Sequence, residues 1–201
     1  MTEYADGDSM LAVIDMQRVF AAPDSPWATP RYAQAAARVL RLLPAFDNDR
    51  VVFTRFIAPA EPIGAWRAYY DQWPFALQPP QSRIWELTDE FAHEDAHLID
   101  APTFGKWTPE LAERVGPGGR LVLAGVSTDC CVLSTALAAQ GVETVVRALA
   151  VREVHDAGLA RRLEVETRSS YSSSGPASWP RAPRSSRTSA ATCRRWRRFE
   201  G

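Results

Sequence analysis

Residues 120–132 read RLVLAGVSTDCCV, and they decide the fold that the sequence predicts. The run from Arg120 to Val126 predicts a strand buried on both faces, because continuous apolar runs are typical of parallel sheets. A helix is expected to follow from about Asp129 to Gln140, and Gly141 ends it. A buried strand that leads directly into a helix is the repeating unit of an α/β domain.

The same alternation extends to both sides of this stretch. Further strands are predicted at residues 10–14 (MLAVI), 51–53 (VVF), 97–99 and 142–151. One further helix is predicted over residues 31–43, with an apolar face made of Tyr32, Ala36, Val39, Leu40 and Leu43. Another is predicted to begin at the N-cap Thr108 and to end at Gly116. We therefore predict an α/β fold, a three-layer α-β-α sandwich around a parallel, Rossmann-like sheet.

The composition fits a globular chain, with 201 residues of which 46% are hydrophobic. No apolar run reaches the roughly 20 residues that a membrane span needs, and MLAVI is too short for a signal peptide. Three cysteines, two of them adjacent, make no disulfide framework and lack the spacing of a zinc site. We therefore expect a cytoplasmic protein with no membrane partner.

The sequence changes character after about Thr167. Residues 168–201 contain no Val, Ile, Leu or Met, and they carry eight arginines against one acid, Glu200. Such a segment cannot bury enough apolar surface to offset the entropy cost of ordering its backbone. We predict one domain over residues 1–167 and a disordered Ser/Arg/Pro-rich tail over residues 168–201. The alternative is that the tail is not native coding sequence.

Three polar or reactive residues stand at or just past the ends of predicted strands. They are Asp15 after MLAVI, Lys106 in FGKW and Cys131 in GVSTDCCV. The carboxyl ends of parallel strands meet at one edge of an open sheet, where such folds bind ligands. Lys106 is also the only lysine among 23 basic residues. We expect the three side chains to meet, although taken singly Asp15 could cap a turn and Lys106 could be a surface charge.

Cys131 has two interpretations. Cysteine is often buried as a small hydrophobic residue, and this is the better interpretation of Cys130. Cys131, however, lies in the first turn of the predicted helix, where free N–H groups and the positive end of the helix dipole favour a thiolate. Its place at this strand-to-helix turn favours a nucleophile.

These motifs resemble those of the isochorismatase-like cysteine hydrolases, a superfamily that includes nicotinamidases and N-carbamoylsarcosine amidohydrolases. The resemblance covers residues 8 to about 155. It rests on a strand that ends in Asp15 and is followed by Met16-Gln17, on Lys106, and on the Gly-Val-x-Thr-Asp-x-Cys-Val turn at residues 125–132. It implies that residues 1–167 form a hydrolase domain.

The resemblance implies that Cys131 is the nucleophile, Asp15 the base and Lys106 the third member of a catalytic triad. The family also has a cis peptide before the residue that corresponds to Ser127, and the N–H groups of Ser127 and Cys131 would form the oxyanion hole. The implied reaction cleaves an amide or carbamoyl C–N bond of a small molecule through a thioester on Cys131. Moving a proton from a free cysteine to a free aspartate is uphill by roughly 6 kcal/mol, so Lys106 and the helix terminus are expected to lower the pKa of the thiol.

The sequence departs from the nicotinamidases, which carry a metal site with Asp-x-His after the second strand. Here residues 54–62 read TRFIAPAEP, and the histidines, His93, His97 and His155, have no ligand spacing. We therefore predict neither metal nor cofactor, and hydrolysis of nicotinamide is disfavoured. The isochorismatases proper act on a vinyl ether and do not keep the cysteine, so Cys131 argues against that reaction.

Aromatic residues are dense at 63–75 (IGAWRAYYDQWPF), where Trp66, Tyr69, Tyr70 and Trp73 share a face at helical spacing. Most such stripes form core, and this is the default here. The functional alternative is that this stripe forms a lid or a subunit-contact wall around an apolar substrate. The candidates for the substrate pocket are Phe20, Phe56, Trp66, Tyr70 and Trp107. Arg55 is expected to form a surface ion pair rather than to bind a substrate carboxylate.

Two other functions stay open. One is a catalytically impaired relative with an incomplete C-terminal end. The other is nucleic-acid binding through the basic tail, which is disfavoured because the rest of the chain is acidic and no binding motif is present. The favoured partner is a small-molecule amide, and the family often forms homo-oligomers. The sequence does not determine the exact substrate.

Overall fold

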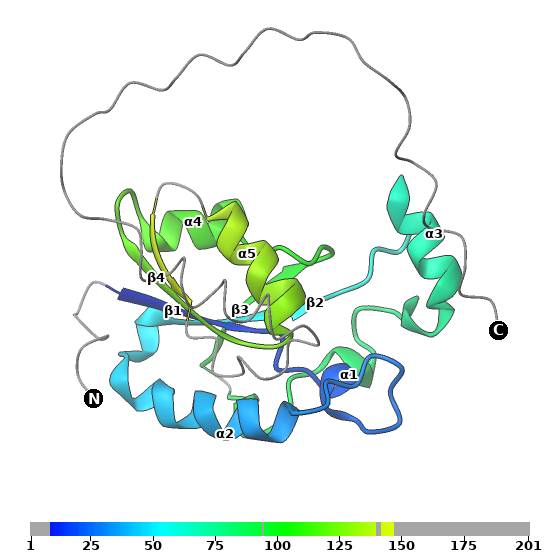
Figure 1. Cartoon of the computed structure of the whole chain (residues 1–201), viewed down its shortest axis with the longest axis horizontal. Coiled ribbons are helices and arrows are strands. Elements are labelled where there is room, and N and C mark those ends of the chain that lie inside the picture. The colour runs from blue at the N-terminus through cyan, green and yellow to red at the C-terminus, as the bar shows by residue number, and fades with distance from the viewer. Residues whose placement is uncertain (1–8, 94, 140–141, 147–201) are drawn as a thin grey trace, which may run out of the picture. The chain divides into compact units, whose positions relative to one another are not determined.

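The structure, a computed structural model, describes residues 9–93, 95–139 and 142–146 of the chain (Figure 1). Within these residues five strands form one sheet: β1 (Ser9–Ile14), β2 (Val51–Phe56), β3 (His97–Ala101), β4 (Arg120–Gly125) and β5 (Glu143–Val146). Their order across the sheet is β3-β2-β1-β4-β5, and every neighbouring pair is parallel. The predicted parallel sheet is confirmed.

Helices connect the strands and cover the sheet. The α-helices are α1 (Arg18–Ala21), α2 (Tyr32–Leu42), α3 (Ala65–Gln72), α4 (Pro109–Val115) and α5 (Leu133–Ala138). A π-helical turn, Thr128–Val132, precedes α5, and 3-10 turns lie at Leu43–Ala45, Asn48–Arg50, Pro74–Ala76, Arg83–Trp85 and Asp89–Phe91. Helix α2 lies on one face of the sheet, and α4 and α5 lie on the other (Figure 1). None of the described helices is long and apolar enough to cross a membrane.

Alternate side chains of β1 enter two separate cores. Leu11 and Val13 pack in the core that also holds Val39 of α2. Ala12, on the opposite side of the strand, packs in the core that holds Leu111 of α4. Every residue of β1 is buried, as expected for a strand with a helix layer on each side. The three-layer α-β-α sandwich is confirmed.

The structure also corrects details of the prediction. Leu40 was expected on the apolar face of α2 but is 41% exposed. It lies about 100° around the helix from the buried Val39, and so outside the face that packs on the sheet. The predicted helix at 129–140 is a π-helical turn followed by α5, which ends at Ala138. Gly141, the last part of the predicted strand at 142–151, and the tail at 168–201 lie outside the described residues.

Candidate active site

Asp15 lies at the carboxyl end of β1, where the chain turns sharply. Its φ is 51°, a left-handed conformation that Asp tolerates better than most residues. The Asp15 N–H donates to the carbonyl oxygen of Thr54, at 3.2 Å, and lies 3.3 Å from its Oγ1. The hydroxyl of Thr54 in turn donates to Oδ1 of Asp15 at 2.8 Å. Strand β2 therefore fixes the orientation of this carboxylate.

Lys106 brings a positive charge to the same place. Its Nζ is 3.1 Å from Oδ2 of Asp15, and both side chains are fully buried. The ammonium also donates to the carbonyl of Thr103 at 2.6 Å and lies 4.7 Å from the centre of the Phe56 ring, a cation–π contact. Oδ2 of Asp15 has this ion pair but no hydrogen bond of good geometry, so it can still accept a proton.

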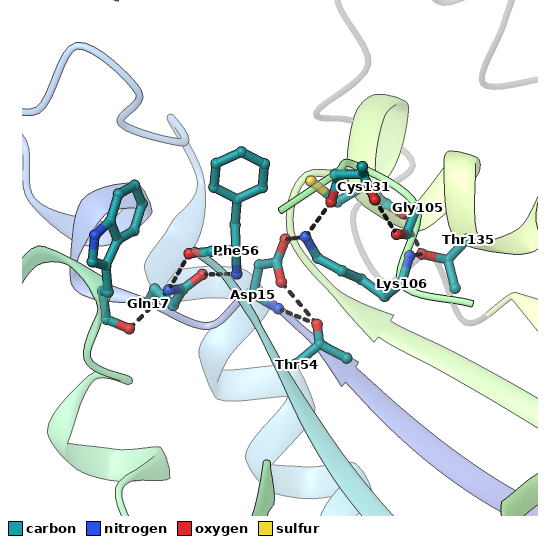
Figure 2. A network of polar contacts seen from close by, with 10 residues as sticks. Asp15, Gln17, Thr54, Phe56, Gly105, Lys106, Cys131 and Thr135 are labelled. Atoms are coloured by element: carbon teal, nitrogen blue, oxygen red, sulfur yellow. Dashed lines mark hydrogen bonds and ion pairs between the residues drawn. The ribbon is translucent and has the colours of Figure 1, made fainter. Parts of the chain in front are cut away.

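One buried hydroxyl, that of Thr135, forms hydrogen bonds with the backbones of both Lys106 and Cys131. The backbone N–H of Lys106 donates to Oγ1 of Thr135 at 2.9 Å, and that hydroxyl donates to the carbonyl of Cys131 at 2.7 Å. Figure 2 shows Asp15, Lys106 and Cys131 gathered beyond the ends of the strands. The structure thus brings together the three residues that the sequence predicted to meet.

The turn between β4 and Cys131 packs tightly against β1. Gly125 has a φ of 110°, and a Cβ there would lie 2.1 Å from the carbonyl oxygen of Ile14, so only glycine fits. The next N–H, that of Val126, donates to the same oxygen at 2.9 Å. The Val126–Ser127 peptide is cis, as the resemblance implied. These contacts place Cys131, which is 4% exposed, beside the end of β1 that carries Asp15.

The expected lowering of the thiol pKa is wrong for the free protein. A hydrogen bond with Cys130, burial and the carboxylate of Asp15 raise the pKa of Cys131 well above its usual value. The ammonium of Lys106 acts in the opposite direction but does not outweigh them. The thiol is therefore neutral at neutral pH, and a base must remove its proton during the reaction.

Cys131 opens onto a cavity of about 190 Å³ with a largely aromatic wall. The lining residues are Phe20, Trp27, Phe56, Tyr69, Phe104, Ser127, Cys130 and Cys131. Phe20 and Phe56 were among the candidates, and they lie in this wall.

Trp66, Tyr70 and Trp107 were also candidates, but they do not line this cavity. Tyr70 is buried in the core, because adjacent residues of α3 point about 100° apart and only Tyr69 can face the cavity. Trp66 packs behind the wall, with its ring centre 5.0 Å from that of Phe104. Trp107 is partly buried and packs against the core that holds Leu111 and Cys131, away from the cavity lining.

Tyr69 of the predicted aromatic stripe lies in the wall, although it was not among the pocket candidates. The sequence did not reveal three residues of the wall: Trp27, Phe104 and Cys130. Trp27 lies between α1 and α2 and contacts the rings of Phe20, Phe56, Tyr69, Trp73, Phe75 and Trp85. A tryptophan in a loop gives no periodic signal, so only the folded chain shows its place.

Gln17 is a further buried residue that supports the site. Its amide donates to the carbonyls of Phe56, at 3.0 Å, and Trp85, at 2.8 Å, and its Oε1 accepts the Phe56 N–H at 2.7 Å (Figure 2). These bonds fix the backbone of Phe56, whose ring contacts Lys106. The Asp-Met-Gln motif signalled this residue, but not its role.

Other polar side chains of the sheet have partners of their own. Arg55 forms the expected ion pair, with two 2.8 Å hydrogen bonds to Asp100. Nε2 of His97 lies 2.7 Å from Glu110. Among the described residues no three His, Cys, Asp or Glu side chains gather as metal ligands would. The absence of a metal from the active protein stays a prediction.

A parallel sheet covered on both faces, with a polar cluster at its carboxyl edge, is typical of α/β enzymes. The family profile of the isochorismatase domain matches residues 9–162, so the chain belongs to the isochorismatase family. No curated protein matches the chain.

Solved structures with the same fold include three of low sequence identity. A cysteine hydrolase from Pseudomonas syringae pv. phaseolicola 1448A is 19% identical, with a TM-score of 0.55 over 65% of each chain. An isochorismatase family protein from Desulfovibrio vulgaris is 16% identical, with a TM-score of 0.60 over 81% of this chain and 90% of that one. N-carbamoylsarcosine amidase from Thermoplasma acidophilum is 17% identical, with a TM-score of 0.54 over 69% and 80%. At these identities the likeness shows the fold alone.

Proposed function

We propose that this protein is a cysteine amidohydrolase that cleaves a C–N bond of a small amide or carbamoyl compound through a thioester on Cys131. The observation that carries the proposal is the fully buried ion pair of Asp15 and Lys106, which lies beside a thiol that lines a cavity. Buried charges that adjoin a nucleophile in a cavity are typical of catalytic sites. The solved relative named N-carbamoylsarcosine amidase adds support, because its name states a C–N substrate.

In the first step Asp15 accepts the thiol proton while the sulfur of Cys131 attacks the carbonyl carbon. Negative charge then moves from Asp15 to the substrate oxygen, while Lys106 keeps its positive charge beside the site. The N–H groups of Ser127 and Cys131 are proposed to bind that oxygen. Protonated Asp15 gives its proton to the leaving nitrogen, the C–N bond of the tetrahedral adduct breaks, and ammonia or an amine departs to leave the thioester.

In the second step Asp15 removes a proton from water as the water attacks the thioester. The sulfur leaves with that proton, and the acid product is released. Proton transfer between the free amino acids is uphill by roughly 6 kcal/mol. Because the pKa of Cys131 is raised, a free thiolate is even less accessible here. The transfer is therefore coupled to formation of the C–S bond.

The cavity wall favours an uncharged substrate with a flat or apolar acyl group. Five of the lining residues are aromatic, and none carries an acidic or basic side chain. A substrate carboxylate would lose its hydration there without meeting a cation, since Lys106 is already paired with Asp15. The small volume, about 190 Å³, also excludes long substrates.

The test is ammonia release from uncharged primary amides, aromatic and aliphatic, compared with N-carbamoyl amino acids that carry a carboxylate. We expect turnover of the uncharged amides and a loss of at least about 10³-fold in Cys131→Ala. Rapid quenching followed by mass spectrometry should find the acyl group on Cys131, and hydroxylamine should release it as a hydroxamate. Cys193→Ala, which changes the third cysteine, is the control and should retain turnover.

Two results would count against the proposal in different ways. Undiminished turnover in Cys131→Ala would remove the cysteine mechanism. Turnover confined to the carboxylate-bearing compounds, and lost in Cys131→Ala, would keep the mechanism and overturn the assigned substrate class.

A further inference from the structure

Two adjacent thiols line the cavity. Cys130 was expected to be buried as a small hydrophobic residue, but it is only partly buried and lies in the cavity wall beside Cys131. The two thiols are close enough that each shifts the pKa of the other, lowering that of Cys130 and raising that of Cys131. We propose that Cys130 and Cys131 form a dithiol site that binds a trivalent organic arsenical, with arsenic bonded to both sulfurs.

The backbone disfavours a direct disulfide between these residues. They are neighbours in the π-helical turn Thr128–Val132, and the peptide that joins them is trans. Adjacent Cα atoms across a trans peptide are about 3.8 Å apart, below the roughly 4.4–6.8 Å that disulfides usually span. One additional atom between the sulfurs relieves this constraint, so the pair suits a bridging ligand.

Trivalent arsenic fits the chemistry of the site. Arsenic in this state is a soft centre that prefers sulfur ligands. An arsenic that carries one carbon substituent and two protein sulfurs is neutral, as suits a cavity whose lining has no charged side chain. An aryl substituent would lie against the aromatic wall, which includes Phe20, Phe56 and Phe104.

The binding step is a condensation without a change of oxidation state. Phenylarsine oxide reacts with both thiols, so that two As–S bonds form and the As–O bond breaks. The two thiol protons leave with the oxygen as water, and arsenic stays trivalent. Because the sulfur of Cys131 is consumed and the cavity is filled, this site is inhibitory for any reaction that uses Cys131.

The test treats the full chain with phenylarsine oxide and follows the protein by intact mass. One phenylarsenic group should add with loss of both thiol protons, and fragmentation should place it across Cys130 and Cys131. The adduct should survive excess mercaptoethanol and be removed by 2,3-dimercaptopropanol, because a monothiol competes poorly with a chelate. Loss of the second As–S bond, in Cys130→Ser or Cys130→Ala, should weaken binding by at least about 100-fold.

Cys193→Ser is the matched control, and it should keep the stable adduct. The proposal is overturned if fragmentation of the wild-type adduct shows arsenic on Cys193. It is also overturned if mercaptoethanol removes the phenylarsenic group from the wild-type protein as readily as from Cys130→Ser. These readouts do not depend on catalysis, so they separate this site from the proposed amidohydrolase activity.

Discussion

The carboxylate of Asp15 and the ammonium of Lys106 lie 3.1 Å apart, and neither side chain has any exposed surface. Asp15 comes from the end of β1, and Lys106 comes from the segment between β3 and α4. Each charge is stabilised mainly by the opposite charge of its partner, because water does not reach either of them. Removing one partner of such a pair leaves the other charge buried and uncompensated.

Lys106→Met should therefore destabilise the protein by about 3–5 kcal/mol and abolish turnover. The double variant Asp15→Asn/Lys106→Met should recover part of the lost stability, because it holds no unpaired charge. Urea unfolding of both single variants and the double variant measures this coupling. Arg67→Met, at an exposed position, is the control and should change stability little. Losses that simply add in the double variant would contradict the prediction.

The raised pKa of Cys131 makes stability depend on pH. The unfolded cysteine titrates near 8.5, whereas the folded protein holds the thiol proton to higher pH. Stability from this group is fully present below about pH 8.5 and falls as the pH rises further, because there only the unfolded chain releases the proton. Contact with Cys131 lowers the pKa of Cys130, so the comparison is made without that second thiol. Free energies of unfolding between about pH 7 and about pH 9.5 should decline more steeply in Cys130→Ala than in Cys130→Ala/Cys131→Ala, because burial and Asp15 still raise the pKa of Cys131. Equal slopes would show that the thiol proton is not held more tightly on folding.

Thr135→Val should lower turnover, because it removes the two hydrogen bonds by which the Thr135 hydroxyl holds the backbones of Lys106 and Cys131 together. The hydroxyl of Thr135 accepts from the Lys106 N–H and donates to the Cys131 carbonyl, and valine can do neither. The buried N–H left without a partner should cost about 1–3 kcal/mol of stability. Thr135→Ser, which keeps the hydroxyl, should retain most of the turnover of wild type. Equal activity in the two variants, measured where both are folded, would count against this role.

Gly125→Ala should prevent normal folding or cost more than about 4 kcal/mol. Its Cβ would collide with the backbone of Ile14, which cannot move without disturbing the pairing of β1 with β4. Gly64→Ala is a matched control, since Gly64 also has a positive φ, of 57°, but has open space around it. That change should cost about 1–3 kcal/mol, because a φ of 57° with a ψ of −134° lies in a region that non-glycine residues populate sparsely. Thermal unfolding of both variants measures the difference, and similar losses would argue against the close approach at Gly125.

The sequence predicted the features that depend on local pattern. The apolar runs at Met10–Ile14 and Arg120–Val126 indicated buried parallel strands, and Thr108 indicated a helix start, where its hydroxyl does accept the N–H of Leu111. The motifs around Asp15, Lys106 and Cys131 indicated that these residues meet, because the carboxyl ends of parallel strands share one edge. These features follow from neighbours along the chain.

Contacts between distant segments decided the rest. Periodicity in α3 could not tell which of Tyr69 and Tyr70 faces the cavity, and no local signal placed Trp27 at the centre of the aromatic cluster. The pKa of Cys131 depends on burial and on Asp15, both of which exist only after the strands have paired. The chemistry of the site residues and the positions of the strands along the chain were thus set by sequence alone. The order of the strands in the sheet and the shape and electrostatics of the cavity were set by packing, because burial and distance are properties of the folded chain.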